Sequence, residues 1–334
     1  MEKNKKYAFF LLLLIMMIIG SVFLWQKLYE NNLADFSKGR TGVTKTNIKL
    51  LASKNETPPL FKEIKILFLG DLMADRYIRQ VMDKKGVDYV FSPIKDLLNS
   101  EDLVIANLEG PITDNNSVSV NTVPGEKNHL IFTFNSVLAP ALFRQNIKLV
   151  NIGNNHMTNF NNSGYLETIK YLEENKINYF GDVYLENKYF VENIGRTKVG
   201  FVNYNQFSSD SAQRAIANIK NLKNQSDVVI VFAHWGIEYK PDPPEAVRNL
   251  ARKFIDSGAD LIIGTHPHII EPTEIYKNKK IYYSLGNFIF DQYFSDETKK
   301  GLAVEVKINP KDKSINFTDF NLSLETSGQT IIKN

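Results

Sequence analysis

Residues 259–268 read Ala259-Asp260-Leu261-Ile262-Ile263-Gly264-Thr265-His266-Pro267-His268. The compact apolar run with two β-branched isoleucines, which stops at Gly264, is typical of a short buried strand. His266 and His268 then lie in the loop where that strand ends, and the carboxyl edge of an α/β sheet is where ligand sites form. Taken alone, the pair fits two metal ligands and two solvated histidines in a surface loop equally well.

The same arrangement, an apolar run followed by polar side chains, occurs earlier in the chain. The runs that predict strands are Lys65–Leu69, Leu103–Ala106, Ile147–Ile152 and Asp227–Ala233. The polar side chains that follow these runs are Asp71, then Asn107 and Glu109, then Asn155 and His156, and finally His234. Helical patterns at 77–85, 163–175 and 244–257 alternate with the strands, which predicts parallel strand pairing.

Further strand-like segments lie at 130–134, 177–180, 199–203, 281–288, 302–308 and 315–322. Short turns separate the later segments, and we expect them to form a second sheet or antiparallel additions to the first. The alternation of polar and apolar residues in the last two suits strands with one wet face.

Each polar motif has a structural alternative when it is considered by itself. Asp71 fits a helix N-cap as well as a metal ligand. Asn107 and Glu109 fit a turn before Gly110 and Pro111 as well as an arm of oxygen donors. His129 lies outside every motif, and we interpret it as an ordinary surface histidine.

Considered together, the motifs favour a metal site. Four of the five histidines in the chain follow predicted strands whose carboxyl ends meet at one edge of a sheet. The donors are nitrogen and oxygen without sulfur, which suits Mn, Zn or Fe better than a pure Mg or Ca cage. They exceed what one tetrahedral ion needs, so we expect two divalent ions about 3.5–4 Å apart.

The composition excludes several other classes of protein. The chain has 334 residues, of which 43% are hydrophobic and 23% charged, as in an ordinary globular protein. A net charge of +3 with scattered basic residues gives no indication of nucleic-acid binding. Because there is no cysteine, disulfides, thiolate zinc sites and a catalytic thiol are excluded.

The N-terminal region predicts a membrane anchor. Residues 7–25 carry no charged side chain and would span about 28 Å as a helix, close to the thickness of a bilayer core. The lysines within residues 1–6 predict a cytoplasmic N-terminus, so that the remainder is extracellular. A cleaved signal peptide is the alternative. Residues 26–62 are interpreted as a linker and 63–334 as the folded domain.

Six ordered motifs carry a resemblance to a known family: Gly70-Asp71-Leu72-Met73, Asn107-Leu108-Glu109-Gly110, Gly153-Asn154-Asn155-His156, His234-Trp235-Gly236, Gly264-Thr265-His266-Pro267-His268 and Ser284-Leu285-Gly286-Asn287-Phe288. They resemble the motif series of the CapA family of capsule proteins, from about residue 64 to 292. That family is linked to poly-γ-glutamate synthesis and export, and it is similar to the calcineurin-like metallophosphatases. The resemblance implies a four-layer α/β/β/α sandwich.

The resemblance also implies roles for individual residues. Metal ligands carried over by motif are Asp71, Asn155, His234, His266 and His268, and His156 matches the histidine that protonates the leaving group. Glu109 stands where the bridging acid is expected, and Asn107 and Asn287 are further candidates. Met73 departs from the phosphatase pattern, which has histidine at this position, and this predicts that one metal position is weakened.

Three functions follow as expectations. The first is a membrane-anchored component of capsular poly-γ-glutamate production with a metal-dependent catalytic site, working with the polymer or its synthase complex. The second is a non-enzymatic module that binds or assembles the acidic polymer, to which Lys277, Lys279 and Lys280 would contribute. The third is a metal-dependent phosphoesterase.

Overall fold

The computed structural model describes residues 62–184 and 189–333. The predicted anchor at 7–25 lies outside the described residues, as does the predicted linker except for its last residue. Within the described ranges, none of the helices has the length and apolar character that crossing a bilayer requires.

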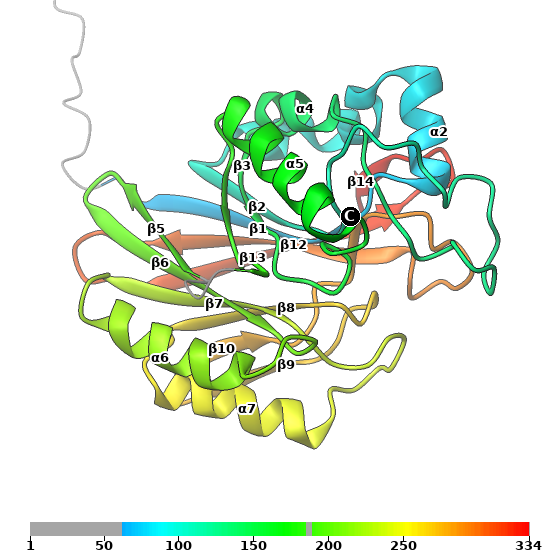
Figure 1. The fold of residues 1–334 in the computed structure, drawn as a ribbon. Helices are drawn as coiled ribbons and strands as arrows, with labels where there is room; N and C mark the ends of the chain where they lie inside the picture. The colour runs from blue at the N-terminus through cyan, green and yellow to red at the C-terminus, as the bar shows by residue number, and fades with distance from the viewer. Residues whose placement is uncertain (1–61, 185–188, 334) are drawn as a thin grey trace, which may run out of the picture. The chain divides into compact units, whose positions relative to one another are not determined.

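Two β-sheets form the centre of the domain (Figure 1). The first has the order β14-β13-β12-β1-β2-β3-β4, with β11 also paired to β1. Its strands are β1 (Ile64–Leu72), β2 (Leu103–Leu108), β3 (Ile147–Asn151), β4 (Asn178–Phe180), β11 (Asn287–Ile289), β12 (Lys300–Ile308), β13 (Ile315–Leu324) and β14 (Thr330–Ile332). Strands β1 to β4 and β11 are parallel, and β12 to β14 are antiparallel additions at one side.

The second sheet has the order β5-β6-β7-β8-β10-β9. Its strands are β5 (Tyr189–Ile194), β6 (Thr197–Asn205), β7 (Val228–His234), β8 (Leu261–Thr265), β9 (Thr273–Tyr276) and β10 (Lys279–Tyr282). The four central strands β6, β7, β8 and β10 are parallel, with an antiparallel strand at each edge.

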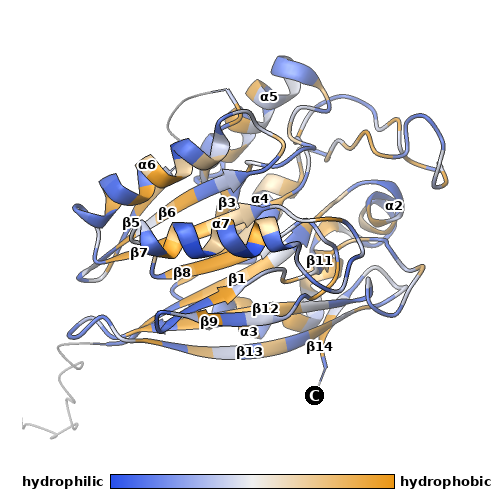
Figure 2. Cartoon of the chain, turned by 90° about the horizontal axis from the view of Figure 1, so that it is seen from below, coloured by the Kyte–Doolittle hydropathy of each residue, from blue (hydrophilic) through white to orange (hydrophobic). Residues whose placement is uncertain are grey.

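Helices cover the outer face of each sheet. Figure 1 shows α2, α4 and α5 against the first sheet, and α6 and α7 against the second. The helices are α2 (Arg76–Lys85), α3 (Lys95–Asn99), α4 (Leu138–Arg144), α5 (Asn161–Glu174), α6 (Ser211–Lys223) and α7 (Glu245–Asp256), with the 3₁₀ helix η1 (Val87–Ile94). In Figure 2, α7 alternates between hydrophilic and hydrophobic residues, as expected for a helix with one buried face.

Three apolar clusters separate the four layers. On β1, Leu67 and Leu69 belong to the cluster beneath the helices of the first sheet, whereas Ile66 and Phe68 belong to the cluster between the sheets. A third cluster joins the second sheet to α6 and α7. Because successive side chains of a strand point to opposite faces, one strand supplies two clusters. The predicted order of layers, α/β/β/α, is confirmed.

Several local predictions differ from the structure. The segment 130–134 forms no extended strand, and only Phe134 makes an isolated bridge, to Ile112. The segment 281–288 is divided between β10 and β11, which belong to different sheets. Gly286, with a φ of +68°, lies in the connection between them. Strand β5 and helix α6 were not predicted.

Candidate metal centre

The predicted site residues come together at the carboxyl ends of β1, β2, β3, β7 and β8. Asp71 is paired in register with Asn107 on β2 and with Asn287 on β11. The residues considered as ligands are Asp71, Glu109, Asn155, His234, His266 and His268, and this set is called the metal centre below. All of them are buried except Asn155, which is half-buried.

Asp71 is fully buried and accepts hydrogen bonds on both carboxylate oxygens. Asn107 Nδ2 donates to Oδ1 at 2.7 Å, and the backbone N–H of His266 donates to Oδ2 at 3.1 Å. Burial alone would raise the pKa of Asp71, but His268, His234 and Asn107 outweigh it and lower the pKa to about 2. The carboxylate is therefore ionised and held in a fixed orientation.

Glu109 is the least satisfied group of the metal centre. Its side chain is fully buried, and neither carboxylate oxygen has a hydrogen-bond partner among the described residues. Burial, followed by the nearby charge of Asp71, raises its pKa well above the usual value. A buried carboxylate beside a second carboxylate is costly unless a cation lies between them. Glu109 thus fits a metal-binding group with Asp71 and His268.

Asn287 fixes the tautomer of His268. Asn287 Nδ2 donates to two backbone oxygens and to Gln292, so its Oδ1, 3.0 Å away, accepts from Nδ1–H of His268. The lone pair of His268 then resides on Nε2, which lies 3.6 Å from Glu109 Oε1. An imidazole held in this way by an outer hydrogen bond is the usual form of a histidine metal ligand. This arrangement favours an orienting role for Asn287.

Asn107 likewise orients its neighbours. Its Oδ1 accepts from Nδ2 of Asn151 at 2.9 Å and of Asn154 at 3.2 Å, while its own Nδ2 faces Asp71 and Nδ1 of His234. Its oxygen is therefore engaged away from the metal centre. The structure thus favours an orienting role over the oxygen-donor role that the sequence suggested.

His234 and Asn155 face one another within the metal centre. His234 Nε2 lies 2.8 Å from Asn155 Oδ1, and its Nδ1 lies 3.1 Å from Thr265 Oγ1. Two ligands of one ion, each about 2.1 Å from it, are separated by about 3.0–3.4 Å, depending on the angle at the metal. The separations of His234 from Asn155 and of His268 from Glu109 are close to this range, so these donors fit transition-metal ions.

His156 lies beside the metal centre with its proton directed inward. Asn159 Nδ2 lies 3.2 Å from Nδ1 and donates to it, which leaves the proton on Nε2, 3.8 Å from Glu109 Oε1. The ring packs on Phe132, with a centroid separation of 4.4 Å. Burial is the main cause that lowers the pKa of His156, to about 3, so the imidazole is neutral.

His266 and His268 have an unusual backbone conformation. Their φ angles are +98° and +59°, a region that costs non-glycine residues energy and occurs often at functional sites. His266 is 5% exposed, and its Nδ1 has no hydrogen-bond partner in the described part of the chain. Phe207, which belongs to none of the sequence motifs, packs edge-on against its ring at a centroid separation of 4.8 Å.

Met73 and the three predicted polymer-binding lysines do not join the metal centre. Met73 is fully buried in the apolar cluster beneath the helices, and its sulfur accepts a hydrogen bond from the backbone of Asp75. The lysines are each paired with a carboxylate: Lys277 with Asp256, Lys279 with Asp260 and Lys280 with Asp319. These lysines therefore give little support to an acidic-polymer surface.

The sequence pattern missed Glu238, which lies in the loop after β7. One of its carboxylate oxygens forms a second possible metal-binding group with His266 and His268. The only available signal was its position four residues after His234. The pattern also missed Asn151 and Asn203, which support Asn107 from β3 and β6.

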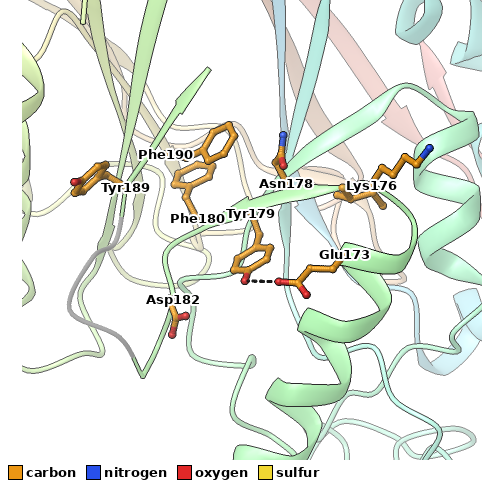
Figure 3. Close-up of a pocket in the computed structure, with 9 residues that line it drawn as sticks. Glu173, Lys176, Asn178, Tyr179, Phe180, Asp182, Tyr189 and Phe190 are labelled. Atoms are coloured by element: carbon orange, nitrogen blue, oxygen red, sulfur yellow. Dashed lines mark hydrogen bonds between the residues drawn. The ribbon is translucent and has the colours of Figure 1, made fainter. Parts of the chain in front are cut away.

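A separate surface cavity of about 470 Å³ lies along β4 and β5, at the edge of both sheets. Figure 3 shows the aromatic rings of Tyr179, Phe180, Tyr189 and Phe190 around this cavity. The hydroxyl of Tyr179 donates a hydrogen bond to the carboxylate of Glu173. None of the predicted site residues lines this cavity. It is therefore distinct from the metal centre.

Solved structures with a distant likeness include a putative 5′-nucleotidase from Staphylococcus aureus in complex with α-ketoglutarate. The two structures align with a TM-score of 0.43 and 12% sequence identity. The alignment covers 81% of this chain and 54% of the nucleotidase chain. Vps29 of Chaetomium thermophilum aligns with a TM-score of 0.32 and 12% sequence identity, over 81% of this chain and 91% of the Vps29 chain.

Closer matches come from sequence. The PGA biosynthesis protein CapA of Bacillus subtilis is 30% identical over 263 residues, 72% of this chain and 68% of that protein. The capsule biosynthesis protein CapA of Bacillus anthracis is 29% identical over 276 residues, 76% of this chain and 66% of that protein. The chain thus spans about two thirds of the length of these relatives. Residues 65–292 match the family described as bacterial capsule synthesis protein PGA_cap, and the chain belongs to this family.

Proposed function

We propose that this chain is a membrane-anchored, extracytoplasmic component of capsular poly-γ-glutamate production, and that its metal centre carries out a hydrolytic or transfer step. Membership of the capsule synthesis family and the names of the Bacillus relatives support the process. The apolar run at 7–25, with lysines before it, supports the anchor and its orientation.

The observation that carries the metal-dependent part is the state of Glu109. A fully buried carboxylate that has no hydrogen-bond donor among the described residues, beside Asp71 and facing Nε2 of His268, matches a cation site better than a structural ion pair. The donor set of carboxylates, imidazoles and one amide suits Mn, Zn or Fe. We propose two ions, because the donors are more numerous than one tetrahedral ion needs.

A divalent ion there would polarise a carbonyl or phosphoryl oxygen and lower the pKa of a water molecule. The protein's own part is orientation. Asn107 holds Asp71, Asn287 holds His268, and Asn159 keeps the proton of His156 on the nitrogen that faces the metal centre. We propose that His156, once it has taken up a second proton from solvent, gives the Nε2 proton to the leaving group and returns to the neutral imidazole, in the role of a general acid.

The test combines metal analysis with polymer formation. Full-length protein, purified in detergent without chelator, is expected to contain about two transition-metal ions per chain, and the double variant His266→Ala/His268→Ala less than one. The same variant, placed in the host chromosome, is expected to abolish surface polyglutamate while the protein persists in the membrane fraction. Normal polymer with the double variant would overturn the proposal, as would wild-type protein that binds no metal.

The anchor has its own test. Carbonate-washed membranes are expected to retain the full chain, and protease added to intact protoplasts is expected to remove the domain that follows residue 62. A domain that is protected until the cells are lysed would contradict the proposed orientation.

A further inference from the structure

Glu238 lies in the loop between β7 and α7, next to two histidines of the metal centre. One of its carboxylate oxygens and one ring nitrogen each of His266 and His268 all lie within 4.8 Å of one another. This group shares His268 with the group formed by Asp71 and Glu109. The two groups are therefore adjacent parts of one centre.

An independent observation on His266 points to a ligand at the same place. His266 is only 5% exposed, and its Nδ1 is buried. This nitrogen has no hydrogen-bond partner among the described residues. Phe207 packs against the ring, and the backbone N–H is engaged by Asp71. The imidazole is thus held in place while one nitrogen remains unsatisfied, a state that costs free energy unless a ligand occupies it.

The loop that carries Glu238 is fastened to the loop of the two histidines. The backbone N–H of Tyr239 donates to the carbonyl of Pro267 at 2.9 Å. Gly236 exchanges two hydrogen bonds of 2.8 Å with the side chain of Gln206. Because both neighbours of the segment 237–238 are fixed, the carboxylate of Glu238 is kept near His266 and His268 by the backbone.

We propose that Glu238 is a metal ligand that joins His266 and His268 in the metal centre. This inference rests on the proposed metal-dependent function. Met73 is buried in the apolar core and supplies no ligand at the position where the phosphatase pattern has histidine. Glu238 would supply a further donor from a different loop. Together with Asp71 and Glu109 it gives three carboxylates against the four positive charges of two divalent ions, which leaves positive charge for an anionic substrate group.

The test uses Co²⁺, whose visible absorption reports the ligands around it without any need for turnover. Metal-free full-length protein in detergent is titrated with Co²⁺, and binding is followed by absorption and by calorimetry. In Glu238→Gln we expect the affinity for one Co²⁺ to fall about tenfold or more, with a changed absorption spectrum. The control is Asp242→Asn, which removes a negative charge from the same loop at a side chain that is 72% exposed.

The outcomes separate this inference from the function on which it rests. Wild-type protein that binds two Co²⁺, together with a Glu238→Gln variant of equal affinity and spectrum, would overturn the role of Glu238 and leave the metal centre intact. Wild-type protein that binds no Co²⁺ would overturn both. If Asp242→Asn weakened binding as much as Glu238→Gln, general charge would explain the effect and the ligand role would be wrong.

A second variant covers the case in which Glu238→Gln does not fold. Glu238→Asp keeps the charge but withdraws the carboxylate by one methylene group. We expect weaker binding of one Co²⁺ than in the wild type and an unchanged unfolding temperature of the metal-free protein. Wild-type Co²⁺ affinity and spectrum in this variant would contradict a ligand role.

Discussion

Asn107 and Asp71 are paired in register on neighbouring parallel strands, and the amide of Asn107 donates to the carboxylate of Asp71 at 2.7 Å. The chain of amides continues behind them, because Asn203 donates to Asn151 and Asn151 donates to Asn107, both at 2.9 Å. This chain crosses from the second sheet to the first. It aligns a buried carboxylate that two of the histidines also approach.

Asn107→Ala is expected to weaken metal binding. The variant removes the donor that orients Asp71 and the acceptor of the Asn151 amide, whereas the amide of Asn154 keeps the carbonyl of Leu108 as an acceptor. Outer hydrogen bonds to metal ligands are typically worth about 10–100-fold in affinity, and we expect a loss in that range by calorimetry. Asn116→Ala, on an exposed loop, is the control. Unchanged affinity in Asn107→Ala would show that Asp71 is held well enough without it.

The positions of the site residues could be predicted because they follow from a local pattern. Apolar strands that end in polar loops must bring those loops to one edge when the strands are parallel. Asn151 and Asn203 could not be found in this way. Both lie within strands, and their roles depend on how the two sheets pack. Glu238 was missed because its distance from the histidines depends on the path of one loop.

Met73→His is expected to destabilise the protein without adding a metal ion. The phosphatase pattern has histidine at this position, but here the side chain is fully buried among apolar residues. An imidazole there loses hydrogen bonds to water, at a cost of about 1–3 kcal/mol. Urea unfolding should show this loss, and elemental analysis should give the wild-type metal content. A third bound ion, or a gain in metal affinity, would mean that the backbone can redirect this side chain.

Gly264→Ala tests why glycine is the penultimate residue of β8, just before the two histidines. A Cβ at this position would lie 1.9 Å from the carbonyl oxygen of Tyr283, so the two backbones would have to separate. We expect a loss of about 3 kcal/mol or more, measured by chemical denaturation. Gly195→Ala is the comparison, because it has a φ of +59° and open space, and should cost only about 1 kcal/mol. Similar losses in the two variants would refute the packing argument.

Asp260 provides a pH-dependent contribution to stability away from the metal centre. Its carboxylate accepts from the backbone of Val229 and pairs with Lys223 and Lys279. Burial acts to raise its pKa, but Lys279, the Val229 N–H and Lys223 outweigh it and lower the pKa. The stabilisation is therefore present above the unfolded pKa of about 3.9 and is lost as the pH falls through the lower folded value.

Asp260→Asn should accordingly be less stable than the wild type by about 2 kcal/mol at pH 7, as judged from urea unfolding. The difference should shrink as the pH falls below about 4, where the wild-type carboxylate becomes protonated. A difference that is constant from pH 7 to pH 3 would show that the charge of Asp260 is not responsible.

The failed local predictions share a physical cause. The segment 130–134 has an apolar pattern because Phe132 and Phe134 pack into the core from a loop, not because it pairs with a strand. The segment 281–288 is buried throughout because it passes from the second sheet to the first. In both cases the pattern reported burial correctly, whereas strand pairing depended on distant parts of the chain.

His156→Ala separates proton donation from metal binding. His156 is not part of either possible metal-binding group, and its Nε2–H points towards Glu109. We therefore expect the variant to keep the wild-type metal content and to reach the membrane normally. Loss of a general acid typically costs a factor of about 10²–10⁴ in rate, so surface polyglutamate should fall to trace levels.

The comparison with Phe132→Leu makes the His156 result specific. Phe132 packs against the imidazole but has no proton to donate, so this variant changes the support of the ring and not the chemistry. We expect a partial loss of polymer in Phe132→Leu and a nearly complete loss in His156→Ala. If both variants made wild-type amounts of polymer, His156 would have no part in the reaction. If His156→Ala lost its metal, the side chain would act in metal binding rather than as the proton donor.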